Sequence, residues 1–418
     1  MEAAPDRLLV ASCDGHVGLP SEQYRDYIEA EHHEAFDDFL GMHRFRWTVA
    51  SDESVLSPAV FDKMKGNDRY ESGGLDSVWD PKRRVEELDA DGIAIEVVFP
   101  DDQQHNTPPW LVGLAPIGMD HAYPRHLRLV GARAYNRWLQ EFCSTDPERL
   151  LGAIVLGSLH DVDAAVTELR RAHASGLHRA VMLPLDYYLP LYHHPRYDPL
   201  WAACEELDLA VAIHLSDGGP EWLGDAPWDG AIYVMEGFFY TQRPLWCLIF
   251  GGVLERHPGL RLVFTEQLAQ WVLTVVPTMD SLASPDGTMA GARTAPLRRP
   301  PSEYFHRQCF VANSLMSRRD IELREQIGTD VLVWGADFPH HEGAWPTVRD
   351  KLRTILDGVP VADAAAIVGG NFLRAYHVDP GALAAVVRRI GPTAGDLGLA
   401  GQGADGSAAD RAPASARL

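Results

Sequence analysis

Residues 8–16 read LLVASCDGH, an apolar run that ends in an acid and an imidazole, Asp14 and His16. Three later runs end in the same way: 211–214 (VAIH), 262–266 (LVFTE) and 331–337 (VLVWGAD). In a parallel barrel, the strand C-termini converge on one face, where the active sites of such barrels are built. The four runs therefore predict that side chains far apart in the sequence meet at one site.

The order of elements along the chain favours a barrel. After the first strand, the sequence predicts strands at 93–99, 152–156, 179–183, 210–214, 261–265, 309–312 and 331–335. Predicted helices lie at 81–91, 125–143, 161–174, 199–207, 271–281, 318–327 and 346–356. Alternating strands and helices are typical of a parallel sheet. A doubly wound open sheet is the alternative, but no Gly-x-Gly-x-x-Gly follows the first strand. We expect a TIM-type (β/α)8 barrel.

Long connections and a biased tail complete the domain organisation. The barrel is expected to span residues 1–390, with an insertion at 20–80 after the first strand. Loops after the first, second and fifth strands are longer than ordinary connections, and such loops are usually functional or disordered. Here they are expected to roof the C-terminal face. From 391 to 418 the chain is rich in Gly, Ala, Ser, Asp and Pro without periodicity, which predicts a disordered tail.

Composition limits the partners of the chain. The 37 Lys and Arg residues against 59 Asp and Glu residues give a net charge of −22, which argues against nucleic-acid or anionic-membrane binding. The five cysteines have no framework spacing, the N-terminal residues do not read as a signal peptide, and no apolar run has the length of a membrane span. The sequence therefore predicts a reduced, cytoplasmic protein. The aromatic residues of the predicted roof suggest a small-molecule substrate, an organic acid or a hydrophobic compound.

Four side chains are candidate ligands of a divalent metal. Asp14 and His16 are two residues apart at a strand end, so they project to the same face. His214 ends the fifth predicted strand and Asp337 follows the eighth. Each has an ordinary structural explanation: a turn, a helix cap or a hydrogen-bonded core histidine. Their shared position at strand ends favours a metal site, because imidazole and carboxylate together are the ligand set of catalytic divalent metals.

Other polar residues are candidates for catalysis or substrate binding. Glu266 ends the sixth strand and is a metal ligand, a general acid or base, an anchor for a substrate cation, or a structural ion-pair partner. His340, close after Asp337, is a further ligand or a proton-transfer group. Three substrate-binding candidates are His105 on the second loop, Trp222 in the aromatic roof, and Arg243, which suits a carboxylate.

The motifs resemble a known family. The Asp14-x-His16 pair, the strand-five His214 and the Gly335-x-Asp337-x-Pro339-His340 segment resemble the amidohydrolase superfamily, in the branch of aminocarboxymuconate-semialdehyde decarboxylase and the hydroxybenzoate decarboxylases. Supporting segments are 135–138 (YNRW), 146–150 (DPERL), 197–201 (YDPLW) and 370–372 (GNF). The resemblance implies that Asp14, His16, His214 and Asp337 are metal ligands. It also leaves a homodimer open, because relatives are often dimers.

The chain departs from the family pattern in ways that bear on the reaction. Asp14 replaces a usual His, Glu266 stands near the position of another, and no Lys or Glu ends the fourth strand to bridge two metals. Three chemistries remain open. One ion, Zn, Mn or Fe, supports non-oxidative decarboxylation with Asp337 or Glu266 handling protons, or hydrolysis with Asp337 as base. Alternatively, Glu266, His340 and His105 help to hold two Fe ions in an O₂-dependent monooxygenase.

Overall fold

Nine parallel strand segments surround one axis. The structure is a computed structural model and describes residues 7–50, 66–100, 106–111, 124–185, 189–215, 228–286, 294–340 and 342–400. The segments are β1 (Ala11–Ser12), β2 (His16–Val17), β3 (Ile95–Pro100), β4 (Leu150–Val155), β5 (Ala180–Met182), β6 (Ala210–His214), β7 (Arg261–Thr265), β8 (Cys309–Asn313) and β9 (Leu332–Trp334). They pair in the order β1-β3-β4-β5-β6-β7-β8-β9, with β2 also on β3. Every pairing between them is parallel.

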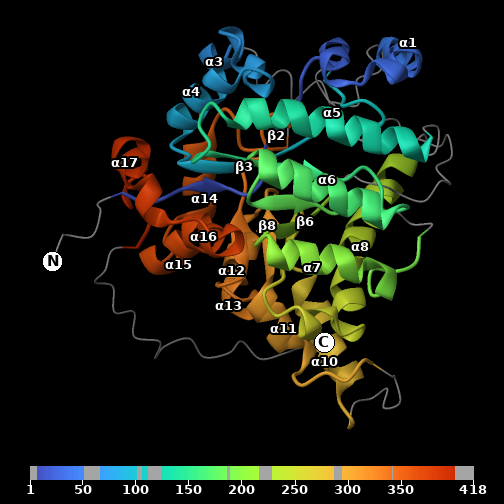
Figure 1. Cartoon of the computed structure of the whole chain (residues 1–418). Helices are drawn as coiled ribbons and strands as arrows, with labels where there is room; N and C mark the ends of the chain where they lie inside the picture. Colours follow the sequence, from blue (N-terminus) through green and yellow to red (C-terminus); the bar gives the residue numbers. More distant parts are fainter. Residues whose placement is uncertain are drawn as a thin grey trace, which may run out of the picture.

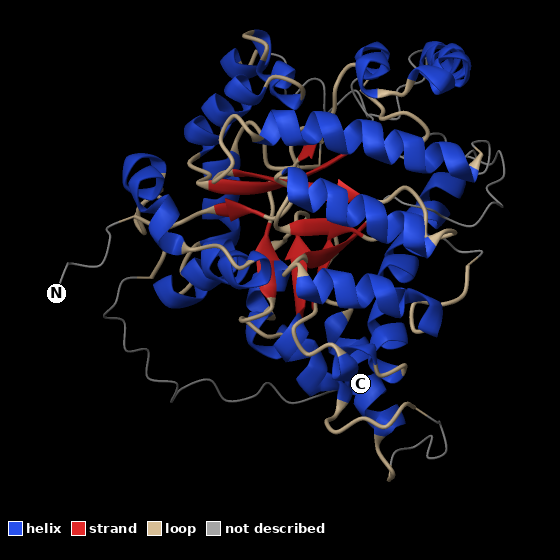
Figure 2. Cartoon of the chain, in the orientation of Figure 1, coloured by secondary structure: helices blue, strands red, loops and turns tan. Residues whose placement is uncertain are grey.

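The sheet closes through its first and last strands. The Cys13 N–H donates to the Trp334 carbonyl oxygen at 3.1 Å, and Gly15 forms an isolated parallel bridge with Phe338. Since β1 and β2 belong to one run interrupted at the Asp14–Gly15 turn, the nine segments make eight barrel strands. The TIM-type (β/α)8 barrel is confirmed, and Figure 2 shows its strands enclosed by helices.

The strands alternate between two apolar layers. On β6, Ala210 and Ala212 face the same cluster as Val263 of β7 and Ala312 of β8, inside the barrel. Residues of the opposite parity, such as Val211, belong to the layer between the strands and the helices. On β6 the small alanines face the interior, and the branched Val211 and Ile213 face the helices.

The helices form an outer ring. They are α4 (Pro81–Asp91), α5 (Arg125–Cys143), α6 (Val162–Ser175), α7 (Asp198–Glu206), α8 (Asp229–Phe250), α9 (Val253–Arg256), α10 (Val272–Ala283), α11 (Pro301–Gln308), α12 (Arg318–Glu322), α13 (Arg324–Ile327) and α14 (Val348–Leu356). In Figure 1, α5, α6 and α7 lie in sequence across one side of the strands. Helix α4 starts where the Asp80 side chain caps two backbone N–H groups and ends at Gly92, whose φ of 80° suits glycine.

Shorter elements cover the two ends of the barrel. The predicted insertion contains η1 (Ser21–Tyr27), η2 (Ala30–His32), α1 (His33–Ala50), α3 (Asp68–Glu71) and η3 (Gly74–Val78). Trp110 of the second loop packs on Phe36 and Phe39, so these two segments form one aromatic cluster above the strands. At the other end lie α15 (Val361–Ala365), the π-helical turn η6 (Ala366–Gly370), α16 (Asn371–Tyr376) and α17 (Pro380–Ile390). Phe372 of α16 joins the inner barrel cluster there.

The predicted tail boundary is too early. Residues 391–400 pack on the barrel: the Leu8 N–H donates to the Pro392 carbonyl oxygen, Arg7 pairs with Thr393 in an antiparallel bridge, and Leu397 is fully buried. The low apolar content hid this short packed segment. Residues 401–418 lie outside the described part of the chain. Among the described helices, none combines the length and the apolar character needed to cross a bilayer.

Candidate metal centre

Five predicted site residues meet at the C-terminal end of the barrel. Asp14 and His16 lie where β1 passes into β2, His214 is the last residue of β6, Glu266 directly follows β7, and Asp337 follows β9. All five side chains are buried. His340, three residues beyond Asp337, is buried beside them. The structure therefore brings together Asp14, His16, His214, Glu266, Asp337 and His340, whereas His105, a candidate for the two-Fe alternative, lies outside the described residues.

Short distances link the members in a chain. The Nε2 atom of His214 lies 3.2 Å from Asp14 Oδ1, and the Nε2 atom of His16 lies 3.3 Å from the same oxygen. His16 Nε2 is also 3.3 Å from Asp337 Oδ1, and His340 Nδ1 is 2.8 Å from that oxygen. Glu266 Oε2 lies 3.5 Å from His214 Nδ1. Donor atoms of overlapping groups lie within 4.8 Å of one another: Asp14, His16 and His214; His16, Asp337 and His340; and Glu266, Asp337, His340 and Glu342.

Backbone carbonyls fix the tautomers of two histidines. The Nδ1–H of His16 donates to the Pro100 carbonyl oxygen at 2.9 Å, and the Nδ1–H of His214 donates to the Leu215 carbonyl oxygen at 2.7 Å. Because a carbonyl only accepts, each Nδ1 carries hydrogen and each Nε2 can present its lone pair to the cluster. This hydrogen bond to the second ring nitrogen is the usual support of a metal-binding histidine.

The carboxylates also fit a cation. Asp14 Oδ2 and Asp337 Oδ2 are buried and receive no hydrogen bond from any residue the structure describes. A buried carboxylate oxygen without a donor is costly unless a cation or water satisfies it. Two imidazole nitrogens and two carboxylates, converging in one buried place, are a donor set that suits Zn²⁺, Mn²⁺ or Fe²⁺.

Two members hold unusual backbone conformations. Glu266 has a φ of 56° and Asp337 a φ of 54°, in the left-handed region that non-glycine residues rarely occupy. Such a conformation costs on the order of 1–3 kcal/mol, and residues that retain it cluster at functional sites. At both positions it falls where the strand ends and the side chain enters the cluster.

The electrostatics divide the acids into two kinds. Burial opposes ionisation of Asp14, but the neighbouring His214 and His16 outweigh it and hold the pKa of Asp14 well below its ordinary value. Burial, together with the negative charges of Asp337 and Asp14, raises the pKa of Glu266 well above its ordinary value. Glu266 is therefore the acid of the cluster that retains a proton most readily.

Without a metal, His16 is protonated on both ring nitrogens. Burial and His340 act to lower its pKa, but hydrogen bonds to Asp14 and Asp337 dominate and raise the pKa of His16 to about 10. The second proton is on Nε2, between the two carboxylates. A cation at this place would replace that proton.

The structure describes one of the three predicted substrate-binding residues. Arg243 lies on α8 with its guanidinium 5.8 Å from the centre of the Tyr240 ring, and none of the described contacts joins it to the cluster. His105 and Trp222 lie outside the described residues. The substrate-binding roles of these three residues stay predictions.

Sequence reasoning missed several residues around the cluster. Phe99 packs on the His214 ring at 4.6 Å, and Gln267 donates to Thr241 of α8, which ties the segment after Glu266 to that helix. Arg84 and Glu96 form a buried ion pair beside Gly15. A signal existed for this pair, since Glu96 interrupts an apolar strand and Arg84 lies on the helix face that carries Leu88.

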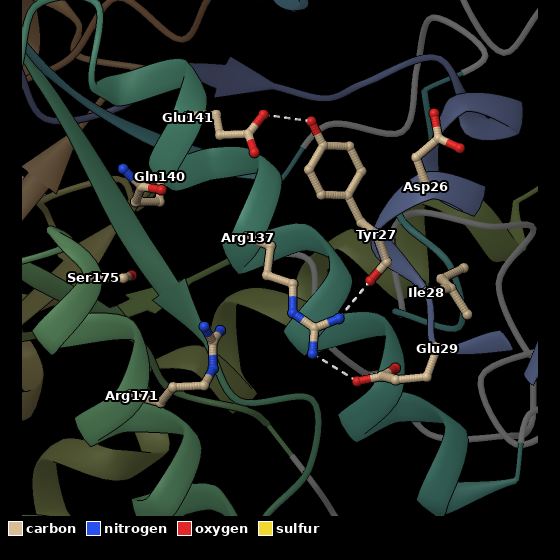
Figure 3. Close-up of a pocket in the computed structure, with 9 residues that line it drawn as sticks. All are labelled: Asp26, Tyr27, Ile28, Glu29, Arg137, Gln140, Glu141, Arg171 and Ser175. Atoms are coloured by element: carbon tan, nitrogen blue, oxygen red, sulfur yellow. Dashed lines mark hydrogen bonds and ion pairs between the residues drawn. The ribbon is translucent and has the colours of Figure 1, made fainter. Parts of the chain in front are cut away.

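A separate hollow lies on the outside of the barrel. It has a volume of about 380 Å³ between η1 and the helices α5 and α6 (Figure 3). Its lining residues are Asp26, Tyr27, Ile28, Glu29, Arg137, Gln140, Glu141, Arg171 and Ser175. Arg137 binds the Tyr27 carbonyl and Glu29, and the Tyr27 hydroxyl donates to Glu141. Arg171 pairs with Glu168, outside the lining, and the lining contains no member of the metal cluster.

Comparison with known proteins identifies the family. A family model described as Amidohydrolase matches residues 89–378, more than half of the chain. The chain belongs to the amidohydrolase family. It is an enzyme, as the predicted motifs implied.

Three proteins similar to this chain are decarboxylases by name. Gamma-resorcylate decarboxylase of Rhodococcus jostii (strain RHA1) is 27% identical over 251 residues, 54% of this chain and 72% of that protein. The 2-amino-3-carboxymuconate-6-semialdehyde decarboxylase of Dictyostelium discoideum is 26% identical over 313 residues, 72% of this chain and 78% of the other. The crystal structure of a dihydroxybenzoic acid decarboxylase from Polaromonas sp. JS666, with bound manganese and the inhibitor 2-nitroresorcinol, covers 88% of this chain and 97% of its own with a TM-score of 0.55 and 16% identity.

These relatives agree with the main prediction and not with its alternative. The amidohydrolase resemblance is confirmed, and the named relatives are decarboxylases, one of them with bound metal. The diiron monooxygenase finds no support among them.

Proposed function

We propose that the protein is a divalent-metal-dependent decarboxylase of a small aromatic carboxylic acid. One observation carries the proposal: His16 and His214, each fixed by a backbone carbonyl, turn Nε2 toward the carboxylates of Asp14 and Asp337. The substrate class is supported by the relatives, which decarboxylate aromatic or related unsaturated acids by name. Mn²⁺ is the proposed metal, because the Polaromonas enzyme binds manganese and the donors here are nitrogen and oxygen.

Asp14, His16, His214 and Asp337 are the proposed ligands. When bound, the ion would supply positive charge that orients the substrate carboxylate and stabilises negative charge developing on the substrate. The pKa of Asp14 lies low enough that a carboxylate is ready for the cation at neutral pH. Asp337 is held between His16 and His340, which fixes the direction of its oxygens.

Glu266 is the proposed proton donor. In decarboxylation the bond between the ring carbon and the carboxyl carbon breaks, its electron pair stays on the ring carbon, and CO₂ leaves. The ring carbon then needs a proton at the same place. Glu266 retains its proton because burial and two neighbouring carboxylates disfavour its ionised form, and solvent water restores the proton after release of the product. His340 is proposed to assist by holding Asp337 in place.

Product analysis tests this function. Chain stripped of metal and reloaded with Mn²⁺ is incubated with 2,6-dihydroxybenzoate and 5-carboxyvanillate, and separately with aryl esters and amides. We expect CO₂ and the decarboxylated phenol from the acids, with activity that vanishes in the stripped chain. Ester or amide hydrolysis without CO₂ release would instead assign the site to hydrolysis.

A further inference from the structure

A buried ion pair lies directly behind the candidate metal centre. Arg84 of α4 donates from Nε to Glu96 Oε2 of β3 at 2.8 Å, and its Nη2 atom lies 2.7 Å from the same oxygen. The exposed fractions of the two residues are 1% and 0%. Neither side chain is a proposed ligand or proton donor, so the proposed chemistry leaves this pair without a role.

The pair packs against the residue that separates two proposed ligands. A Cβ atom added to Gly15 would lie 2.2 Å from Glu96 Oε1 and 2.6 Å from Arg84 Nη2, so any side chain there would displace the ion pair. Gly15 stands between Asp14 and His16, and its carbonyl oxygen accepts from the Phe99 N–H at 2.8 Å. The ion pair therefore forms the surface on which this turn rests, and only glycine allows so close an approach.

The same guanidinium reaches the last ligand segment. Its central carbon lies 4.0 Å from the centre of the Phe338 ring, and Phe338 directly follows Asp337. The Phe338 carbonyl oxygen accepts from the His16 N–H at 2.6 Å. A planar guanidinium with a carboxylate at its edge and an aromatic ring on its face has one orientation. Arg84 thus touches the first and the last ligand segments together.

Stability alone is a poor explanation for such a pair. The free-energy cost of removing two charges from water is often larger than the gain from their attraction. Apolar replacements of buried ion pairs are therefore often neutral or stabilising. A fixed, fully buried pair next to a ligand turn fits a role in orientation, since the supporting contacts of metal ligands typically change metal affinity when they are lost.

We propose that Arg84 and Glu96 are positioning residues that hold the Asp14–Gly15–His16 turn and Asp337 in the arrangement that binds a divalent cation. The inference rests on the proposed metal site. It adds that the geometry of the ligands depends on an ion pair that contacts neither metal nor substrate.

The test replaces both members of the Arg84–Glu96 ion pair at once, so that an effect of lost orientation is not confused with that of an unpaired buried charge. The double variant Arg84→Met with Glu96→Met keeps side chains of similar length, leaves no unpaired buried charge and loses only the directed contacts. The control is Arg149→Met with Asp89→Asn. Arg149 is also a buried arginine, with Nη1 2.9 Å from Asp89 Oδ1, but it binds the carbonyls of Ile93 and Ala94, which come just before β3, rather than the Asp14–His16 turn or Phe338.

The readouts are the Mn²⁺ dissociation constant, the electron paramagnetic resonance spectrum of bound Mn²⁺, and the circular dichroism of each variant. In the double variant we expect native circular dichroism, a dissociation constant raised by about ten- to a hundredfold, and an altered Mn²⁺ spectrum. The control is expected to bind Mn²⁺ as the wild type does. Glu96→Gln is a second, smaller variant, which leaves Arg84 as an uncompensated cation and is expected to weaken Mn²⁺ binding as well.

Each contrary result has a distinct meaning. Wild-type affinity and spectrum in the folded double variant and in Glu96→Gln overturn this inference and leave the metal site in place. An equal loss of affinity in the control pair also overturns it, since an ion pair that does not touch the ligand segments would then have the same effect. A wild-type chain that binds no Mn²⁺ overturns the proposed function, and this inference with it.

Discussion

The backbone N–H of Asp337 donates a hydrogen bond of 2.9 Å to the carbonyl oxygen of Asp14. These two residues are the first and the last proposed ligands, and they lie in the segments that close the barrel. The hydrogen bond sets the backbone of one ligand against that of the other, so the separation of their side chains follows from barrel closure. The same contacts that close the barrel therefore bring these two proposed ligands together.

Metal binding is therefore expected to stabilise the fold. A cation that binds only the folded chain adds about 2.7 kcal/mol at a free concentration of one hundred times its Kd. We expect the Tm of chelator-treated protein to rise with Mn²⁺ concentration in differential scanning calorimetry. His214→Ala serves as the comparison and is expected to show a flat response. A wild-type Tm that does not change with Mn²⁺ concentration would contradict the coupling between metal binding and folding.

Each single substitution of a proposed ligand is expected to weaken metal binding. Asp14→Asn, His16→Ala, His214→Ala and Asp337→Ala each remove one donor, and each is expected to lower bound Mn²⁺ per chain, measured by plasma mass spectrometry after dialysis. Activity should fall in parallel. The control is His257→Ala, whose ring pairs with Glu205 away from the cluster. Full metal occupancy in all four ligand variants would refute the proposed set.

Glu266 is expected to affect turnover more than metal content. Glu266→Gln keeps the shape but removes the transferable proton, so we expect kcat to fall by about 10²- to 10⁴-fold, the range of general acid catalysis. Mn²⁺ occupancy should stay near that of the wild type. Steady-state kinetics with metal analysis of the same sample measures both. If occupancy is lost as well, Glu266 is a ligand, as the first interpretation of its position allowed.

The affinity for metal is expected to rise with pH. His16, with a pKa raised to about 10, must lose its Nε2 proton for the cation to bind there, whereas Asp14 is ionised throughout the neutral range. Below pH 10 each unit of pH should therefore increase the affinity up to tenfold, with release of about one proton per ion. Calorimetric titrations in buffers of different ionisation enthalpy count the protons. A pH-independent affinity between 6 and 8 would show that His16 is already neutral.

Gly15 is expected to tolerate no side chain. Gly15→Ala drives a methyl group into Glu96 and Arg84, and overpacking of this kind costs typically about 1–3 kcal/mol. We expect a lower free energy of unfolding together with weaker Mn²⁺ binding. Gly41→Ala on α1 is the control: its Cβ would meet nothing within 4 Å, and alanine in a helix is favoured over glycine by about 0.5–1 kcal/mol.

The strands and their terminal residues were accessible from the sequence because they depend on local pattern. The run at 210–214 is apolar, short and ended by His214, and it forms β6 with these bounds. The candidate ligands followed from one topological rule, that parallel strands present their C-terminal residues on a common face. No contact had to be known for that step.

Contacts between elements were not accessible in this way. The Arg84–Glu96 pair depends on how α4 packs on β3, and residue spacing says nothing about that angle. The contact of the Arg243 guanidinium with the Tyr240 ring depends likewise on how α8 is placed, which the charge of the residue does not indicate. The same holds for 391–400, where a few buried side chains such as Leu397 outweigh a composition typical of disorder.

The hydrogen bond between Cys13 and Trp334, which closes the barrel, joins an early part of the chain to a late one. The first barrel strand can pair with β3 early, but its other edge finds a hydrogen-bonding neighbour only after β9 has been translated. At elongation rates of about 5–20 residues per second, the N-terminal strand waits for many seconds with one edge open. A nascent chain of this protein therefore exposes an unpaired strand edge until β9 has been translated, a period in which chaperone binding would matter most.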